Sequence, residues 1–143
     1  IVLAEKLSKP LFLHERAAAE EFVRRFKKHP EICKKSVVHC FTGDKRTLEK
    51  YLDMGFFIGI TGWICDDRRG KELREAVKLV PLDRILMETD APYLMPKNVP
   101  GLARVNVPEN IVYVARDLAK YMGVPEDVLI HAAKENTERI FCI

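Results

Sequence analysis

The sequence predicts an α/β fold built from successive β/α units, and three observations support this prediction. Four short apolar runs of strand length alternate with segments of helical periodicity along the chain. Three of these runs stop on a side chain that can bind a metal. No Gly-rich phosphate loop of the kind found in doubly wound sheets follows an early strand. Together these features favour a β/α barrel, which places its functional residues at the carboxyl ends of its strands.

The first part of the sequence predicts a helix, a strand, a second helix and a second strand. Residues 1–7 are the last turns of a helix, which Pro10 ends because a proline disfavours helical geometry in the residue before it. Residues 10–14 form the first predicted strand. An amphipathic helix over residues 17–28 follows and is expected to end at Pro30, and residues 36–40 form the second strand.

The middle of the chain carries clear helix boundaries. Asp44 is a suitable N-terminal cap for a helix that runs through Met54, and Gly55 stands where a left-handed C-terminal residue is expected. Residues 56–62 predict the third strand. After a polar loop at 65–70, whose charged side chains we expect in solvent, residues 71–80 predict a further helix.

The last part of the chain begins with the fourth strand, over residues 84–88. A proline-containing loop at 91–105 follows, and loops of this length in compact domains are often functional. A helix capped by Asn106 is predicted to run to Met122. Two short helices, over residues 126–132 and 134–141, complete the prediction.

Four parallel strands make half of an eight-stranded β/α barrel, which takes about 250 residues. We therefore expect residues 1–143 to form one region, the C-terminal half of a TIM-type barrel with about strands 5–8 and their helices. The chain begins in mid-pattern without an initiator Met, which suggests a piece of a longer protein. An open four-stranded parallel sheet is the alternative that length alone favours.

The composition is that of a globular protein, with 48% hydrophobic and 31% charged residues of both signs. No apolar run is long enough for a membrane span, and no secretory signal is present, so we expect a cytoplasmic or nuclear protein without membrane contact. The net charge of +3 permits contact with a polyanion without demanding it. Four cysteines without CxxC spacing are expected to be reduced thiols.

The side chains at the strand ends predict a metal site. His14 and His39 end the first two strands, and Asp90 follows the fourth. Imidazole and carboxylate groups bind Zn, Mn or Mg, and a bound metal lowers the pKa of its water to about 7. Glu88 precedes Asp90 by two residues and faces the same way, which suits a residue that orients a ligand histidine. A metal-dependent hydrolase is the leading interpretation.

Five segments, in this order along the chain, resemble the signature segments of the TatD-type metal-dependent deoxyribonucleases. They are residues 14–16 (HER), 38–43 (VHCFTG), 58–63 (IGITGW), 88–93 (ETDAPY) and 135–141 (ENTERIF). The resemblance implies an amidohydrolase-type barrel with one or two divalent cations, Mg, Mn or Zn. It implies that His14, His39 and Asp90 are metal ligands, with Asp90 also a proton acceptor. Members of the family also supply a His-x-His pair and a glutamate from earlier strands, which this sequence lacks.

The resemblance further implies phosphodiester hydrolysis of DNA, most simply from single-stranded or frayed ends by an exonuclease. Arg16 lies two residues beyond His14, and its guanidinium group suits a phosphate, so we place it with Asp90 and Glu88 in the catalytic set. Phe41, Trp63 and Tyr93 follow strand ends and suit stacking on bases, although Trp63 suits packing under the long loop equally well.

Two other functions remain open at this point. A hydrolase of another ester or amide would use the same metal ligands with a different pocket. A non-catalytic fragment would act through the exposed half of its core, because a half barrel leaves two sheet edges unpaired. Such a fragment would associate with the missing N-terminal half or with itself. Cys40 is expected to lie in the core, pointing away from His39.

Overall fold

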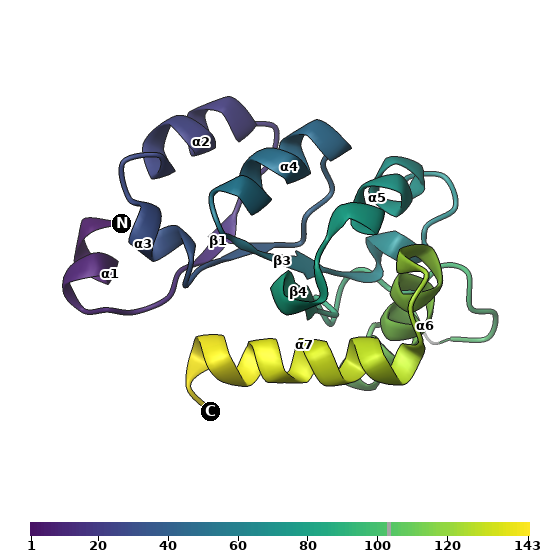
Figure 1. The fold of residues 1–143 in the computed structure, drawn as a ribbon. Coiled ribbons are helices and arrows are strands. Elements are labelled where there is room, and N and C mark those ends of the chain that lie inside the picture. Colours follow the sequence, from purple (N-terminus) through teal and green to yellow (C-terminus); the bar gives the residue numbers. More distant parts are fainter. Residues whose placement is uncertain (103) are drawn as a thin grey trace.

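The computed structural model describes residues 1–102 and 104–143, and it contains one four-stranded parallel sheet (Figure 1). The strands are β1 (Phe12–His14), β2 (Val37–His39), β3 (Phe57–Ile60) and β4 (Ile85–Met87). Their order in the sheet is β1-β2-β3-β4, so each strand pairs with the next in sequence. A doubly wound sheet reverses its order at a switch point, and the described sheet does not.

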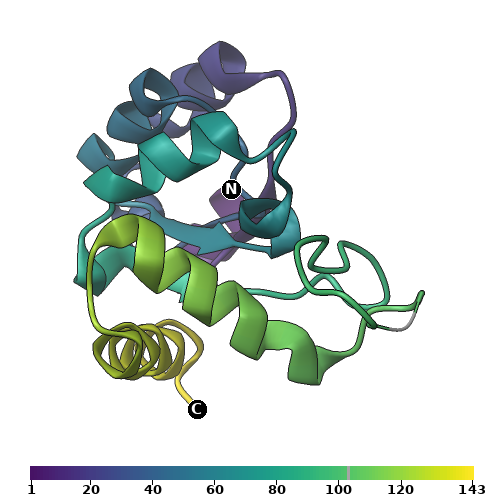
Figure 2. The same cartoon turned by 90° about the vertical axis from the view of Figure 1, so that its right-hand side faces the viewer.

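Helices precede the first strand, connect each strand to the next and follow the last strand. They are α1 (Val2–Lys6), α2 (Ala19–Phe26), α3 (Pro30–Cys33), α4 (Lys45–Asp53), α5 (Lys71–Ala76), α6 (Ile111–Met122) and α7 (Glu126–Phe141). Short 3-10 turns are η1 (Gly62–Cys65), η2 (Val77–Leu79), η3 (Leu82–Arg84) and η4 (Pro108–Asn110). Helices α2, α4 and α5 lie above the sheet in Figure 1, and α7 runs below it. Figure 2 shows α6 beside α7, with the long loop before α6 extending away from the sheet.

The two faces of the sheet have separate cores because successive side chains of a strand point to opposite faces. On the outer face, Val38, Ile58 and Ile85 pack against the helices in one large cluster. On the inner face, a small cluster is formed by Val37, Phe57 and Leu86 with Ile140 of α7. Since both faces are covered over β2 to β4, the uninterrupted apolar runs of these strands are explained.

Several predicted boundaries are confirmed by the structure. The Asp44 carboxylate accepts a hydrogen bond from the Thr47 backbone N–H at 2.8 Å, and it caps α4. Gly55 and Gly123 both have left-handed backbone angles, with φ of +89° and +72°. These positions were predictable because cap chemistry is local.

Three predicted elements need correction. The last two short helices are one continuous α7, since the Ala-Ala-Lys sequence at 132–134 contains no helix breaker. Pro30 does not simply end a helix but begins the short α3, in the N1 position that suits a proline. Asn106 does not cap α6, which begins at Ile111 after η4.

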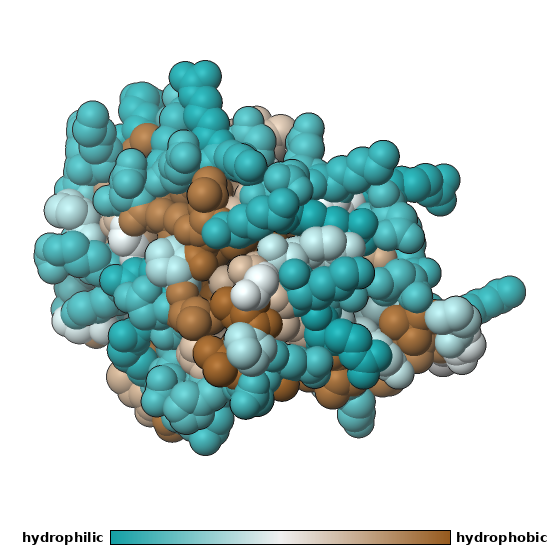
Figure 3. Space-filling model, turned by 45° about the vertical axis from the view of Figure 1, so that its right-hand side comes forward, coloured by the Kyte–Doolittle hydropathy of each residue, from teal (hydrophilic) through white to brown (hydrophobic). Residues whose placement is uncertain are grey.

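The surface that comes forward in Figure 3 is mostly hydrophilic, with apolar side chains gathered in a band across its middle. Among the described residues, no helix has both the length and the apolar character needed to cross a membrane.

Candidate metal centre

The two predicted ligand histidines lie side by side on the inner face of the sheet. His14 and His39 are register partners at the ends of β1 and β2, and their ring centroids are 4.5 Å apart. Asp90 follows β4, and its Oδ1 atom lies 3.1 Å from Nε2 of His39. The structure therefore places His14 next to His39 and His39 next to Asp90, while His14 does not belong to the described group of donor atoms that all lie within 4.8 Å of one another.

His39 is held between two carboxylates. Its Nδ1 atom lies 2.8 Å from Oε2 of Glu88, on the side opposite Asp90. The contact with Glu88 raises the pKa of His39, and the Asp90 charge adds to this effect, while burial acts in the other direction. The His39 side chain is only 8% exposed, so the imidazole has a fixed orientation.

Two polar atoms of this group have unused hydrogen-bonding capacity. His39 Nδ1 is close to Glu88, but its N–H is poorly aligned with the carboxylate, and Glu88 Oε1 has no partner in the described residues. Buried polar atoms in native proteins are rarely left this way unless a ligand, ion or water completes them. On the other side of the ring, Nε2 of His39 and Oδ1 of Asp90 lie 3.1 Å apart, and this donor set of imidazole and carboxylate groups fits a divalent cation.

Glu88 reaches His39 because Gly59 leaves space for it. Gly59 lies two residues after Phe57 in β3, and a Cβ atom there would stand 2.2 Å from Oε1 of Glu88. The Cys40 backbone N–H also donates to Oε2 of Glu88 at 3.0 Å. Gly59 was not among the predicted site residues, although a glycine inside an apolar strand indicates that another group approaches the backbone closely at that point.

Cys40 lies at the site rather than in the core facing away from it. Its φ of +49° turns the chain at the end of β2, and its Sγ atom lies 3.2 Å from Oγ1 of Thr61. One donor atom from each of His39, Cys40 and Asp90 lies within 4.8 Å of the others. Burial raises the pKa of the Cys40 thiol to about 11, so the thiol stays protonated at neutral pH without a metal. The expectation for Cys40 was wrong because it assumed that strand alternation continues past His39.

The segment that carries Asp90 is held by Asn106. Asp90 has a left-handed backbone with φ of +56°, which is uncommon for a residue other than glycine. The Asn106 side-chain amide donates to the carbonyl oxygens of Thr89 at 3.0 Å and Tyr93 at 2.6 Å. Asn106 is buried, and its own N–H donates to the Pro92 carbonyl at 3.1 Å. The residue predicted as a helix cap thus fixes the loop on both sides of Asp90.

The other predicted site residues are distributed around the same end of the sheet. Arg16 is exposed and lines a hollow of about 600 Å³ with Thr42 and Gly43, and that lining includes neither histidine nor Asp90. Tyr93 is 74% exposed and lies three residues from Asp90. Trp63 is half-buried in η1, and the Arg69 guanidinium carbon lies 5.2 Å from its ring centroid.

Phe41 does not have the position that its predicted stacking role requires. The side chain is 3% exposed and packs in the main core, with its ring centroid 6.0 Å from that of Tyr51. After the turn at Cys40, Phe41 points to the helix-covered side of the sheet. Its ring has no free face for a nucleobase.

A parallel sheet whose strand ends carry two histidines and an aspartate, with a carboxylate behind one histidine, offers groups that suit a divalent metal ion. The chain belongs to the family of TatD related DNases, whose sequence model matches residues 1–142. Two relatives are "3'-5' ssDNA/RNA exonuclease TatD" proteins, from Rahnella sp. (strain Y9602) at 40% identity over 100% of this chain and from Erwinia tasmaniensis at 43% identity over 99%.

A solved structure of a TatD homolog from Escherichia coli K12, YJJV, superimposes with a TM-score of 0.88 at 30% identity. The match covers 99% of this chain and 53% of the E. coli chain. The chain also spans 55% of the length of each of the two relatives. The fold and family are therefore shared over the whole chain, while the relatives contain nearly as much sequence again.

Proposed function

We propose that this chain is part of a metal-dependent nuclease that removes nucleotides from the 3′ ends of single-stranded DNA or RNA. The names of its relatives support this substrate class. The observation that carries the proposal is the arrangement of His39, which lies between Glu88 and Asp90 beside the His14 ring. That arrangement suits a metal ligand with a fixed orientation.

Within this proposal His14, His39 and Asp90 would hold one or two divalent ions, Mg, Mn or Zn. The metal would supply an activated water and polarise the scissile phosphodiester. Glu88 would keep the His39 imidazole in place and draw its Nδ1 proton toward the carboxylate, which leaves Nε2 free to bind. Asp90 would both bind and accept a proton from the attacking water. Tyr93, being exposed near Asp90, would stack on the terminal base.

Arg16 has a more distant role in this proposal than the sequence indicated. It lines the hollow between the turns that follow β1 and β2, and neither histidine lines that hollow. The preceding Glu15 is fixed by the Tyr51 hydroxyl, which donates to its Oε2 atom at 2.8 Å. Arg16 would therefore contact a phosphate other than the scissile one.

We also propose that β1 to β4 are the last four strands of an eight-stranded barrel, with residues 1–143 as a single region. Among the described residues the sheet has two free edges, at β1 and β4, and Phe12 on its inner face is 47% exposed. A preceding half with four strands would pair both edges, and it would add the His-x-His and glutamate ligands that the family resemblance implies. The metal centre would then be complete only in the assembled barrel.

The experiment combines this chain with the residues that precede the matched region in the Rahnella relative, produced as a separate polypeptide. With Mn²⁺ or Mg²⁺, the mixture is expected to shorten a 5′-labelled single-stranded 20-mer from its 3′ end. The change Asp90→Asn should abolish product formation, and the control His131→Gln, at an exposed position of α7, should not. Hydrolysis of simple esters without cleavage of DNA would support the alternative hydrolase. A monomer that binds neither metal nor the added half would support a non-catalytic fragment.

A further inference from the structure

We propose that a cationic surface beside the metal centre binds the phosphates of the nucleic-acid strand beyond the scissile bond. This surface, the basic rim, is formed by the exposed side chains of Arg46, Arg68, Arg69 and Lys71. The inference rests on the proposed function, because it names where the rest of the same strand lies. In the described part of the chain, no carboxylate lies within ion-pair distance of these four cations. Their exposed neighbours Lys45 and Lys78 both pair with Glu75, at 3.6 Å and 2.6 Å.

The basic rim lies at the end of the sheet that carries the metal centre. Arg46 is in the first turn of α4, which follows β2, and the other three residues connect β3 to α5. Arg46 and Lys71 line one hollow with Lys45, and Asp44, Glu72 and Glu75 are its acidic members. Because the carboxyl ends of parallel strands meet at one edge, these connections lie at the same end of the sheet as His39 and Asp90.

Arg46 of the rim stands where helix stability does not favour a cation. The N-terminal end of a helix carries partial positive charge and prefers acidic side chains. Helix α2 follows that rule with Glu20 and Glu21 in its first turn. Helix α4 instead has Lys45 and Arg46 there, after its cap Asp44, while α5 has Glu72 in its first turn next to Lys71. A role in binding an anion explains the position of Arg46, which the stability of α4 does not.

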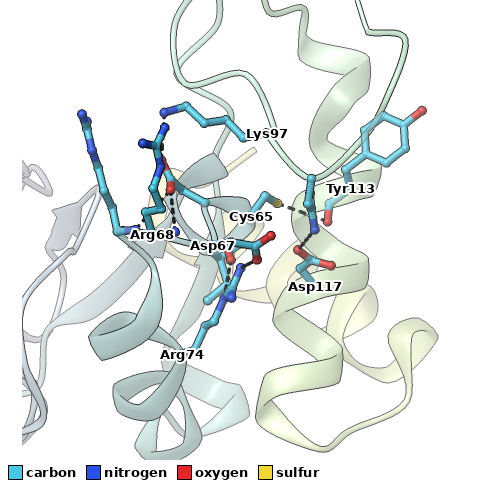
Figure 4. Close-up of polar contacts among 11 residues, drawn as sticks. Cys65, Asp67, Arg68, Arg74, Lys97, Tyr113 and Asp117 are labelled. Carbon is cyan, nitrogen blue, oxygen red and sulfur yellow. Dashed lines mark hydrogen bonds and ion pairs between the residues drawn. The ribbon is translucent and has the colours of Figure 1, made fainter.

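The turn that presents Arg68 and Arg69 is held by groups other than their side chains (Figure 4). Asp66 is 5% exposed, and its Oδ1 atom accepts hydrogen bonds from the backbone N–H groups of Arg68 and Arg69 at 3.0 and 3.1 Å. Its Oδ2 atom accepts from Lys97 at 2.8 Å. Asp67 accepts from Arg74 at 2.9 Å. The two aspartates of the turn are thus paired with Lys97 and Arg74. The side chains of Arg68 and Arg69 are therefore available to a ligand.

Trp63 supports Arg69 in this arrangement. The Arg69 guanidinium carbon lies over the half-buried indole at 5.2 Å from its centroid, a cation–π contact. That contact holds the Arg69 guanidinium group on the rim. It also occupies a face of the indole ring on which a nucleobase was expected to stack. Trp63 is therefore a positioning residue for Arg69.

The turn is also joined to the segment that carries Asp90. A Cβ atom at Gly62 would stand 2.1 Å from the Leu94 carbonyl oxygen, so only glycine permits this approach. Arg68 and Lys97 line a second hollow, of about 460 Å³, between the turn and the loop at 95–102. A strand whose 3′ end reaches the metal centre can continue over Trp63 and Arg69 without leaving the protein surface.

The test measures binding of fluorescein-labelled dT20 to this chain by fluorescence anisotropy, in EDTA and at several salt concentrations. The double change Arg68→Gln with Arg69→Gln is expected to weaken binding about tenfold at low salt. The plot of log K against log salt has a negative slope, and the double change should make it less steep by about 1.4, the value for two lost contacts to single-stranded phosphates. Circular dichroism should be unchanged, and the midpoint of thermal unfolding should fall only slightly, because the cation–π contact between Arg69 and Trp63 is lost.

The matched control is Arg24→Gln with Arg25→Gln, an adjacent and exposed arginine pair on α2 that contacts Glu21. This control removes the same charge and should leave the affinity for dT20 near that of the parent chain. Equal weakening by the two pairs, or no weakening by either, would overturn the basic rim. So would a parent chain that binds Mn²⁺ in calorimetry but has no affinity for dT20. If dT20 binds as expected and the assembled barrel cleaves no nucleic acid, the proposed function fails and the rim stands.

Discussion

Gly59 is the residue whose small size determines where the Glu88 carboxylate lies. The nearest atoms to a Cβ at this position are all from the Glu88 carboxyl group, at 2.2 to 2.6 Å. The carboxyl group lies at the end of a flexible side chain, so an added methyl group would displace it without moving the backbone. Gly59 therefore affects the orientation of His39 indirectly, because it leaves space for the Glu88 carboxylate that contacts the imidazole.

The change Gly59→Ala is expected to weaken binding of Mn²⁺ by about 10- to 100-fold, the usual effect of losing a carboxylate that orients a ligand histidine. The free energy of unfolding should change by less than about 1 kcal/mol, because alanine also restricts the unfolded chain. Titration calorimetry and urea unfolding measure the two quantities. Glu88→Gln should reproduce the loss of affinity. Unchanged Mn²⁺ binding in Gly59→Ala would show that Glu88 does not orient His39.

Asp66 gives a prediction at acidic pH. The hydrogen bond from Lys97 is the main reason that the pKa of Asp66 falls from its usual 3.8 to about 2, and the N–H groups of Arg69 and Arg68 add to it, while burial opposes the shift. A carboxyl whose pKa is lower in the folded state stabilises the fold above its unfolded pKa. That contribution is lost as the pH falls through the folded pKa.

The change Asp66→Asn should therefore lower the free energy of unfolding by about 1 kcal/mol at pH 7, because the amide keeps one acceptor oxygen but loses the charge that Lys97 contacts. The difference from the parent chain should shrink between pH 4 and pH 2, the interval between the two pKa values. Urea unfolding at several pH values measures it. A difference that stays constant down to pH 2 would contradict the assigned role of Lys97.

At the scale of the elements, α7 is fixed to the sheet by one buried side chain. The Asn136 amide donates to the carbonyl oxygens of Leu82 at 2.8 Å and Ile85 at 2.9 Å, at the start of β4. The Asn136 carbonyl oxygen accepts from Arg139 at 2.7 Å. Four residues further along the helix, Ile140 packs on the inner face of the sheet. The helix thus joins β4 by hydrogen bonds and the sheet by apolar contact.

Replacing Asn136 with Leu should destabilise the chain by about 1 to 3 kcal/mol, because two buried carbonyl groups lose their donor. Asn136→Asp should have a similar effect, since the carboxylate cannot donate. The neighbouring change Thr137→Ala removes only a hydrogen bond to Ala133 in the same helix, and it should have a smaller effect. Urea unfolding followed by circular dichroism compares the three variants. Equal loss in Asn136→Leu and Thr137→Ala would contradict the anchoring role.

The elements that the sequence predicted well are those that depend on local chemistry. The four strands and the caps at Asp44, Gly55 and Gly123 follow from apolar runs and turn residues. The parallel pairing brings His14 and His39 together, as the prediction of equivalent strand ends requires. Cys40 and Phe41 were misplaced because a left-handed residue reverses strand alternation, and φ cannot be read from a cysteine. Asn106 was misread because both roles of an asparagine, capping and bridging a loop, have the same sequence pattern.

At the scale of the whole molecule, the sheet is packed on both faces, but its two edge strands are paired on one side only in the described part of the chain. Helices cover its outer face, while β1 and β4 have no partner on their far edges among the described residues. Free edges of this kind expose unpaired backbone groups and favour association with another chain. The position of His14 on the edge strand β1 means that the metal centre lies next to one of these edges.

Hydrogen exchange therefore distinguishes a half barrel from an independent open sheet. In this chain alone, the amides of the interior strand β3 should exchange slowly and those of β1 and β4 faster, because exposed edges open with a lower free energy. Addition of the preceding half from the Rahnella relative should slow exchange in β1 and β4 and leave β3 nearly unchanged. Mass spectrometry of peptic peptides that cover the three strands measures the effect. A control polypeptide in which the added half is scrambled should give no protection. If the genuine half protects neither edge, the four strands form a complete sheet by themselves, and the metal centre must function with the ligands that this chain contains.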